Sequence, residues 1–196
     1  MKRLLSFLFA TLFTCGFAAQ EVRDSSTGAV FPAQISFDEG GTKYDLSATG
    51  VATRKKFGIK VYSVAHYLQG GDSEKDRFQQ ILEDDKAKQL TMNWLRSASQ
   101  QQIKEGYEDS FRKTLSPSLH NQLAKDIQKY VSFFTESTKK GDVMVIRWTP
   151  GGKITLLMND KELGTLTNPT FAKELWNLWF GDKSVVDRNQ LVSLMK

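Results

Sequence analysis

The sequence predicts an α+β domain: a largely antiparallel, open-faced β-sheet covered on one face by a layer of helices. Three observations favour this class. Short segments of alternating polarity, separated by glycine-rich turns, occur in the first third of the chain and again near its end. Between and after them, apolar residues recur at helical spacing. The 196 residues suit one domain, and no repeat or linker divides them.

The first 19 residues have the pattern of a secretory signal peptide. Lys2 and Arg3 precede an apolar stretch that runs to Phe13, and small residues follow it. We expect cleavage after residue 19, a mature domain over residues 20–196, and a periplasmic location. The alternatives are a retained anchor, for which the stretch is shorter than the ~20 residues of a membrane span, and a lipid attached to Cys15.

Composition argues against several functional classes. The 27 Lys plus Arg against 22 Asp plus Glu give a net charge of +5 spread along the chain, which disfavours nucleic-acid binding. Cys15 is the only cysteine, so cleavage would leave no disulfide and no thiol nucleophile. His66 and His120 are far apart, and no phosphate-binding loop or zinc motif occurs. We therefore expect no metal and no cofactor.

Two β-hairpins are expected in the first third of the mature chain. Residues 32–38 and 42–49 are short mixed segments on either side of Glu39-Gly40-Gly41, a turn signal. From Gly50 to Leu68, β-branched and aromatic residues lie on both sides of Gly58. These patterns predict one hairpin around residue 40 and a second around residue 58.

The middle of the chain is predicted to be mostly helical. Residues 73–86 carry apolar side chains at helical spacing, and the alternating Gln89–Leu95 segment predicts a strand. Ser99 and Gln102 form a possible capping box ahead of a helix over about residues 100–115. Ser116-Pro117 then begins a second helix, whose apolar face would hold Leu119, Leu123, Ile127, Tyr130 and Phe134.

The last third returns to strands before a final helix. Val143 begins an alternating segment that ends at Pro150-Gly151-Gly152, and Asn159-Asp160 marks the next turn. The pattern predicts an antiparallel meander. Asn168-Pro169 would cap a last helix that ends at Gly181. Its two tryptophans, like the others in the chain, are expected in the core, namely Trp94, Trp148, Trp176 and Trp179.

Arg54 and Tyr62 are the strongest candidates for a binding site. If Gly58 is the centre of the second hairpin, these residues are cross-strand neighbours on one face, ~5 Å apart at Cβ. A guanidinium beside a phenol can hold a carboxylate or a developing oxyanion. The alternative interpretation is that Arg54 belongs with Lys55, Lys56 and Lys60 to a solvated basic hairpin while Tyr62 packs in the core.

Four segments resemble the bacterial chalcone isomerase-like proteins: GVATRKKFGIKVYSVAHYL, IKEGYEDSFRKTL, GGKITLLMNDKELGTL and FAKELWNLWFGD. The resemblance covers nearly all of the mature chain. It implies a fold in which an open-faced sheet and a helical layer enclose an apolar cleft. In the true isomerases, Arg and Thr from the hairpin region and Tyr and Asn from a helix act on a phenolate. The non-enzymatic plant relatives hold a fatty-acid carboxylate with Arg and Tyr.

Carried over residue by residue, the resemblance implies four site residues. Arg54 matches the Arg of both groups, and Tyr62 falls where the enzymes have Thr but the fatty-acid binders have Tyr. Tyr107 matches the helical Tyr, although its place on an apolar helix face also suits core packing. Thr114 stands where the enzymes have Asn. The pattern is therefore nearer to that of a binder.

The leading hypothesis is an exported protein that binds a small apolar acid, such as a fatty acid, or a phenolic ligand. One alternative is an isomerase or intramolecular lyase in which Arg54, Tyr62 and Tyr107 are catalytic. Another is a non-catalytic partner in envelope assembly. His66 shares a strand face with Tyr62, which leaves a proton-transfer role open. No membrane span is expected after cleavage, and the sequence does not indicate an oligomeric state.

Overall fold

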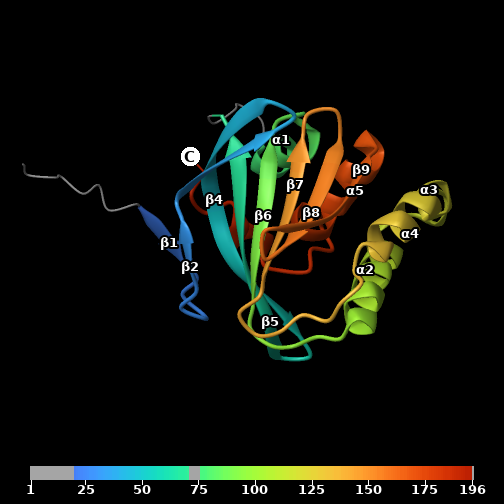
Figure 1. Cartoon of the computed structure of the whole chain (residues 1–196), viewed down its shortest axis with the longest axis horizontal. Coiled ribbons are helices and arrows are strands. Elements are labelled where there is room, and N and C mark those ends of the chain that lie inside the picture. The colour runs from blue at the N-terminus through green and yellow to red at the C-terminus, as the bar shows by residue number, and fades with distance from the viewer. Residues whose placement is uncertain (1–19, 71–75, 196) are drawn as a thin grey trace, which may run out of the picture.

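A curled antiparallel sheet forms the body of the protein in this computed structural model, which describes residues 20–70 and 76–195 (Figure 1). Each strand of the sheet pairs with the next one in the chain, so the whole sheet is a meander. Its seven strands, in order, are β3 (Gln34–Glu39), β4 (Thr42–Lys56), β5 (Ile59–Gln69), β6 (Lys88–Trp94), β7 (Val143–Thr149), β8 (Lys153–Met158) and β9 (Lys161–Thr167). The α+β class and the antiparallel sheet are confirmed.

The helices lie against one face of this sheet, as predicted. α2 contacts both α4 and α5, while α4 contacts β9 and α5 contacts β8. On β5, alternate side chains such as Tyr62 and Val64 join the core between sheet and helices. The described helices are α1 (Arg77–Glu83), α2 (Gln100–Thr114), α3 (Pro117–Gln122), α4 (Ala124–Ser132), α5 (Pro169–Phe180) and α6 (Arg188–Leu191).

A small hairpin that the sequence patterns did not predict covers part of the opposite face. β1 (Glu21–Arg23) pairs with β2 (Val30–Pro32) outside the main sheet, and Phe31 packs in a second apolar cluster with Tyr67 of β5. The Asp24 carboxylate, which follows β1, accepts hydrogen bonds from Thr53 of β4 and Ser63 of β5. These bonds attach the hairpin to the sheet.

Most predicted boundaries agree with the structure. Ser99 and Gln102 form a capping box at the start of α2, and Asn168 caps α5, which ends at Gly181. The four tryptophans are all buried, as expected. The helix predicted over residues 73–86 is described from its Asp76 cap to Glu83, and residues 73–75 lie outside the described part of the chain.

The single helix predicted after Ser116 is wrong, because the chain forms two helices that meet at Leu123. Leu123 has φ −93° and ψ 6°, which turns the chain between α3 and α4. No side chain of α3 is buried, whereas α4 buries Ile127, Tyr130 and Val131. The turn therefore directs the apolar face of α4 onto the core.

The predicted signal peptide, with Cys15, lies outside the described residues. Within residues 20–70 and 76–195, no helix combines the length and the apolar character that a membrane span requires.

Candidate functional site

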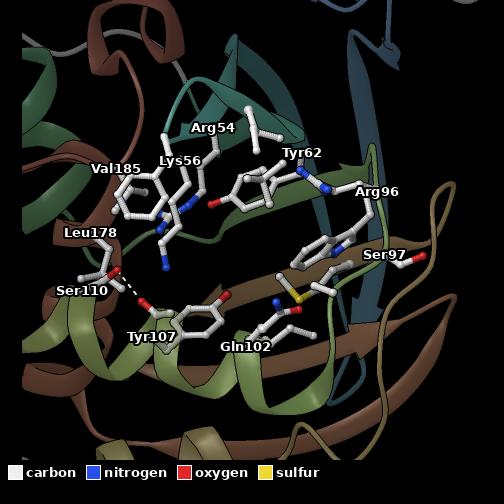
Figure 2. A pocket seen from close by; sticks show the side chains of 18 of the residues that line it. Arg54, Lys56, Tyr62, Arg96, Ser97, Gln102, Tyr107, Ser110, Leu178 and Val185 are labelled. Carbon is white, nitrogen blue, oxygen red and sulfur yellow. Dashed lines mark hydrogen bonds between the residues drawn. The ribbon is translucent and has the colours of Figure 1, made fainter.

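A cavity of about 440 Å³ lies between the β4–β5 hairpin, the segment after β6, and helices α2 and α5 (Figure 2). This volume falls within the range of roughly 300–1,000 Å³ that is usual for small-molecule sites. Its floor is largely apolar and aromatic. The buried apolar and aromatic residues that line it include Tyr62, Trp94, Ile103, Tyr107, Leu178 and Trp179.

The hairpin brings Arg54 and Tyr62 together at one side of this cavity, as the sequence predicted. The two residues are cross-strand partners, and the Arg54 Cζ lies 5.9 Å from the centroid of the Tyr62 ring. Lys55 pairs with Lys60, so Val61 is an extra residue on β5. This bulge lets both side chains face the cavity, and Figure 2 shows them next to each other above α2.

Trp179 positions the hydroxyl of Tyr62. The indole Nε1–H at the end of α5 donates a hydrogen bond of 3.1 Å to the Tyr62 oxygen. Because an indole can only donate, Tyr62 acts here as the acceptor and keeps its own O–H. The structure gives this hydroxyl no other partner among the described residues. Tyr62 can therefore donate a hydrogen bond to a ligand.

The mouth of the cavity is positively charged. Arg54, Lys56 and Arg96 line it, and no Asp or Glu is among the described lining residues. None of the three cations forms an ion pair within the part of the chain that the structure describes. Arg54 is half-buried, whereas Lys56 and Arg96 are exposed. Three uncompensated cations beside an apolar floor favour an anionic group at the mouth.

One face of α2 forms the opposite wall. Ile103, Gly106, Tyr107 and Ser110 all line the cavity at helical spacing. The Tyr107 ring stacks on Phe134 with centroids 5.1 Å apart. Burial raises the pKa of the Tyr107 phenol, so its hydroxyl stays protonated. Tyr107 thus combines core packing with access to the cavity, the two interpretations that its sequence position left open.

Thr114 does not share this wall. It is half-buried, does not line the cavity, and donates its hydroxyl to the Ser110 carbonyl oxygen at 3.0 Å. The same local bond occurs one turn earlier, where the Ser110 hydroxyl donates to the Gly106 carbonyl. Of the four residues that the resemblance implied, the structure places three at the cavity and Thr114 outside it.

His66 also lies away from the cavity, in a buried hydrogen-bonded chain. Trp176 donates to its Nε2 at 3.2 Å, so Nδ1 carries the proton and donates to the Thr49 hydroxyl at 2.7 Å. Thr49 in turn donates to the Leu191 carbonyl. Burial, together with the nearby charge of Lys88, lowers the pKa of His66 well below its usual value. This histidine connects β4, β5, α5 and α6.

Sequence reasoning missed several lining residues. Lys56 was placed in the basic run, Arg96 follows β6 without a recognisable motif, and Gly106 carried no signal. The indole Nε1 of Trp94 is buried without a partner in the described structure, at a residue that lines the cavity. No cluster of three metal-binding side chains occurs among residues 20–70 and 76–195.

Comparisons with known proteins agree with the fold. A family model described as chalcone isomerase-like matches residues 24–191. The crystal structure of a fatty-acid binding protein from Arabidopsis thaliana superimposes with a TM-score of 0.74 at 15% identity, covering 88% of this chain and 96% of that one. At this identity the likeness shows the fold alone. A search of curated proteins found no match.

Proposed function

The chain belongs to the chalcone isomerase-like family, and we propose that it binds a small apolar molecule carrying one acidic group, either a fatty-acid-like carboxylate or a phenol. The observation that carries this proposal is the lining of the cavity. Three cations without a carboxylate surround an apolar floor, which suits a ligand with an anionic head and an apolar body. A structural relative described as a fatty-acid binding protein supports the same ligand class.

Two side chains would donate hydrogen bonds to the head group. The planar guanidinium of Arg54 offers two parallel N–H donors that match a carboxylate. Tyr62 adds its O–H, which Trp179 leaves free. The apolar body would lie between Trp94 of β6 and Ile103 of α2. Each Å² of apolar surface that it buries contributes about 25 cal/mol of hydrophobic free energy, part of which offsets the freedom lost on binding.

The alternative of an isomerase or intramolecular lyase has less support from the same lining. Of the four residues that the resemblance assigns to the isomerases, Tyr62 stands in place of their Thr, and Thr114, at the position of their Asn, does not line the cavity. Only Arg54 and Tyr107 of the enzyme pattern are therefore present at the site. Ring closure of a chalcone faster than in buffer, and lost in Arg54→Gln, would establish the enzyme instead.

We also propose that the protein is exported to the periplasm, on the signal-peptide pattern of residues 1–19. Amino-terminal sequencing of the protein from a periplasmic extract should then begin at Gln20. Recovery from the cytoplasm with Met1 retained would contradict this.

A role in envelope assembly would be favoured if simultaneous replacement of Arg54 and Tyr62 left the cellular phenotype unchanged.

The binding proposal is tested by displacement of a fluorescent fatty acid from the delipidated protein with palmitate. Arg54→Gln removes the charge and should weaken palmitate binding about tenfold or more, the usual effect of losing a charge-assisted hydrogen bond. Lys55→Gln is the matched control, because Lys55 is the next residue on β4 but does not line the cavity. Equal affinities in both variants, or no binding by the wild type, would overturn the proposal.

A further inference from the structure

The turn of the β4–β5 hairpin presents two large apolar side chains to solvent. Phe57 is 92% exposed and Ile59 is 49% exposed. In the rest of the described chain, only Leu194 is a comparably exposed large apolar residue. In Figure 1 the hairpin ends at the lower side of the molecule, across from α2. Apolar exposure is thus concentrated at one projecting tip.

The backbone of this turn is unfavourable for the residue it carries. Phe57 has φ 51° and Gly58 has φ 76°, the two positive values of a type I′ turn. The first position of such a turn favours Asn, Asp or Gly, and a bulky aromatic residue is rarely found there. Neither packing nor backbone preference therefore explains Phe57, which points to a role outside the fold.

Cations flank the two apolar side chains. Lys55, Lys56 and Lys60 are exposed, and residues 54–60 include no acidic residue. The Lys60 ammonium donates a hydrogen bond to the carbonyl oxygen of Ser26, which lies in the turn between β1 and β2. Asp24, which contacts this hairpin through Thr53 and Ser63, is buried and does not offset the surface charge. The tip is thus both apolar and positively charged.

We propose that this tip, defined as Lys55, Lys56, Phe57, Ile59 and Lys60, docks on an anionic phospholipid surface. Phe57 and Ile59 would enter the interface between head groups and acyl chains while the lysines pair with lipid phosphates. Two apolar side chains are far too few for a stable protein interface, which buries ~800 Å² on each partner. They are sufficient for a shallow membrane contact supported by charge.

Docking in this way would place the cavity mouth at the lipid. Lys56, Phe57 and Ile59 line that mouth as well as forming part of the tip. An apolar molecule could therefore pass between the bilayer and the cavity without crossing open water. The docking itself does not require the cavity to be filled, and it can be measured on delipidated protein.

Vesicle flotation tests the proposal with phosphatidylcholine alone and with added phosphatidylglycerol. The wild type should float with the mixed vesicles, float much less with the neutral ones, and be released by salt. Phe57→Asn should lower its partition about tenfold or more, the affinity equivalent of burying one large apolar side chain. Asn suits the backbone of this turn, so the variant should melt at the same temperature or higher.

Two controls distinguish binding through the tip from nonspecific binding of the protein to vesicles. Leu194→Asn removes an exposed apolar side chain elsewhere and should leave flotation unchanged. Lys125→Gln with Lys129→Gln removes two exposed charges on α4, which contacts β9 at the far edge of the sheet, and should have less effect than Lys55→Gln with Lys56→Gln. Equal flotation of wild type and Phe57→Asn would overturn the proposal. A dimer that dissociates in Phe57→Asn, with no vesicle binding, would assign the tip to a second copy instead.

Discussion

Gly106 lies in the interior of α2, where glycine is unfavourable, and nothing close to it requires glycine. A Cβ placed there would meet no atom within 4 Å, and the residue lines the cavity. Because alanine is the better helix former, Gly106→Ala should raise the free energy of unfolding by about 0.5–1 kcal/mol. Urea denaturation measures the change.

A larger side chain at the same position tests whether the open space holds the ligand. Gly106→Leu should keep the protein folded but lower fatty-acid affinity, because the side chain would enter the cavity. Gly106→Ala is the matched control, since its methyl group takes up little of that space. Unchanged affinity in Gly106→Leu would mean that the ligand binds elsewhere.

The pairing of Arg54 with Tyr62 could be predicted from the sequence only in part. Symmetry about Gly58 gave the correct partners, yet the turn itself consists of Phe57 and Gly58, with Lys56 opposite Ile59. Because Val61 is an extra, unpaired residue on β5, Arg54 still lies opposite Tyr62 although Lys55 lies opposite Lys60. A bulge of this kind depends on how the strand bends over the helices, and residue pattern does not reveal it.

At the scale of elements, the attachment of the β1–β2 hairpin depends on Asp24. Burial alone would raise the pKa of this carboxyl, but hydrogen bonds from Thr53, Ser63 and Ser26 outweigh that effect and lower the pKa. Asp24→Ala should therefore reduce the free energy of unfolding by about 1.5–3 kcal/mol, as expected for hydrogen bonds to a charged group. Urea denaturation checks this.

Asp38→Ala provides the comparison for Asp24→Ala. Asp38 is an exposed carboxylate on β3, and its removal should change stability by less than about 0.5 kcal/mol. The pKa of Asp24 is lower in the folded protein than in the unfolded chain, so its ionised carboxylate stabilises the fold at neutral pH. This stabilisation is lost as the pH falls through the folded pKa, where the carboxylate takes up a proton. The free energies of unfolding of Asp24→Ala and Asp38→Ala should therefore converge in acid. A difference that persists in acid would show that the carboxylate charge is not involved.

Element boundaries were predictable where a local signal marks them. The caps at Ser99 and Asn168 fixed the starts of α2 and α5. The turn at Leu123 was not predictable, because the apolar spacing continues through it without interruption. β1 and β2 have three residues each, too few for a strand period to appear. Their position depends on contacts with β4 and β5, which are distant in sequence.

For the whole molecule, the buried His66 predicts a loss of stability in mild acid. Its pKa is lowered by burial and by the charge of Lys88, so the unfolded chain takes up a proton below about pH 6.5 while the folded protein does not. As the pH falls below about 6.5, the free energy of unfolding should therefore decrease by about 1.4 kcal/mol per pH unit, until the pH reaches the pKa of His66 in the folded protein. Urea denaturation across this range gives the slope.

His66→Gln identifies the source of that slope. The variant removes the titrating group, so its stability should depend less on pH between about 6.5 and 5 than that of the wild type, even if its overall stability is lower. His120→Gln, at a half-buried position on α3, is the control and should retain the wild-type slope. Equal slopes in wild type and His66→Gln would assign the acid sensitivity to other groups.

The fold could be predicted from the sequence because turn signals, strand alternation and helix caps agree along the chain. The expectation of a cleft came from the family resemblance. The resemblance also pointed to Arg54, Tyr62 and Tyr107 in its lining, whereas Arg96 and Gly106 reach the cavity from segments without a motif. Tertiary arrangement brings these residues together, and no local pattern records it.

The most direct test is an NMR titration of palmitate labelled with ¹³C at its carboxyl carbon and bound to the delipidated protein. If the head group lies against Arg54, its pKa should be well below that of an unperturbed carboxyl, because a guanidinium favours the charged form. The pKa should rise in Arg54→Gln and remain low in Lys55→Gln. A bound carboxyl whose pKa is the same in wild type and Arg54→Gln would contradict the account.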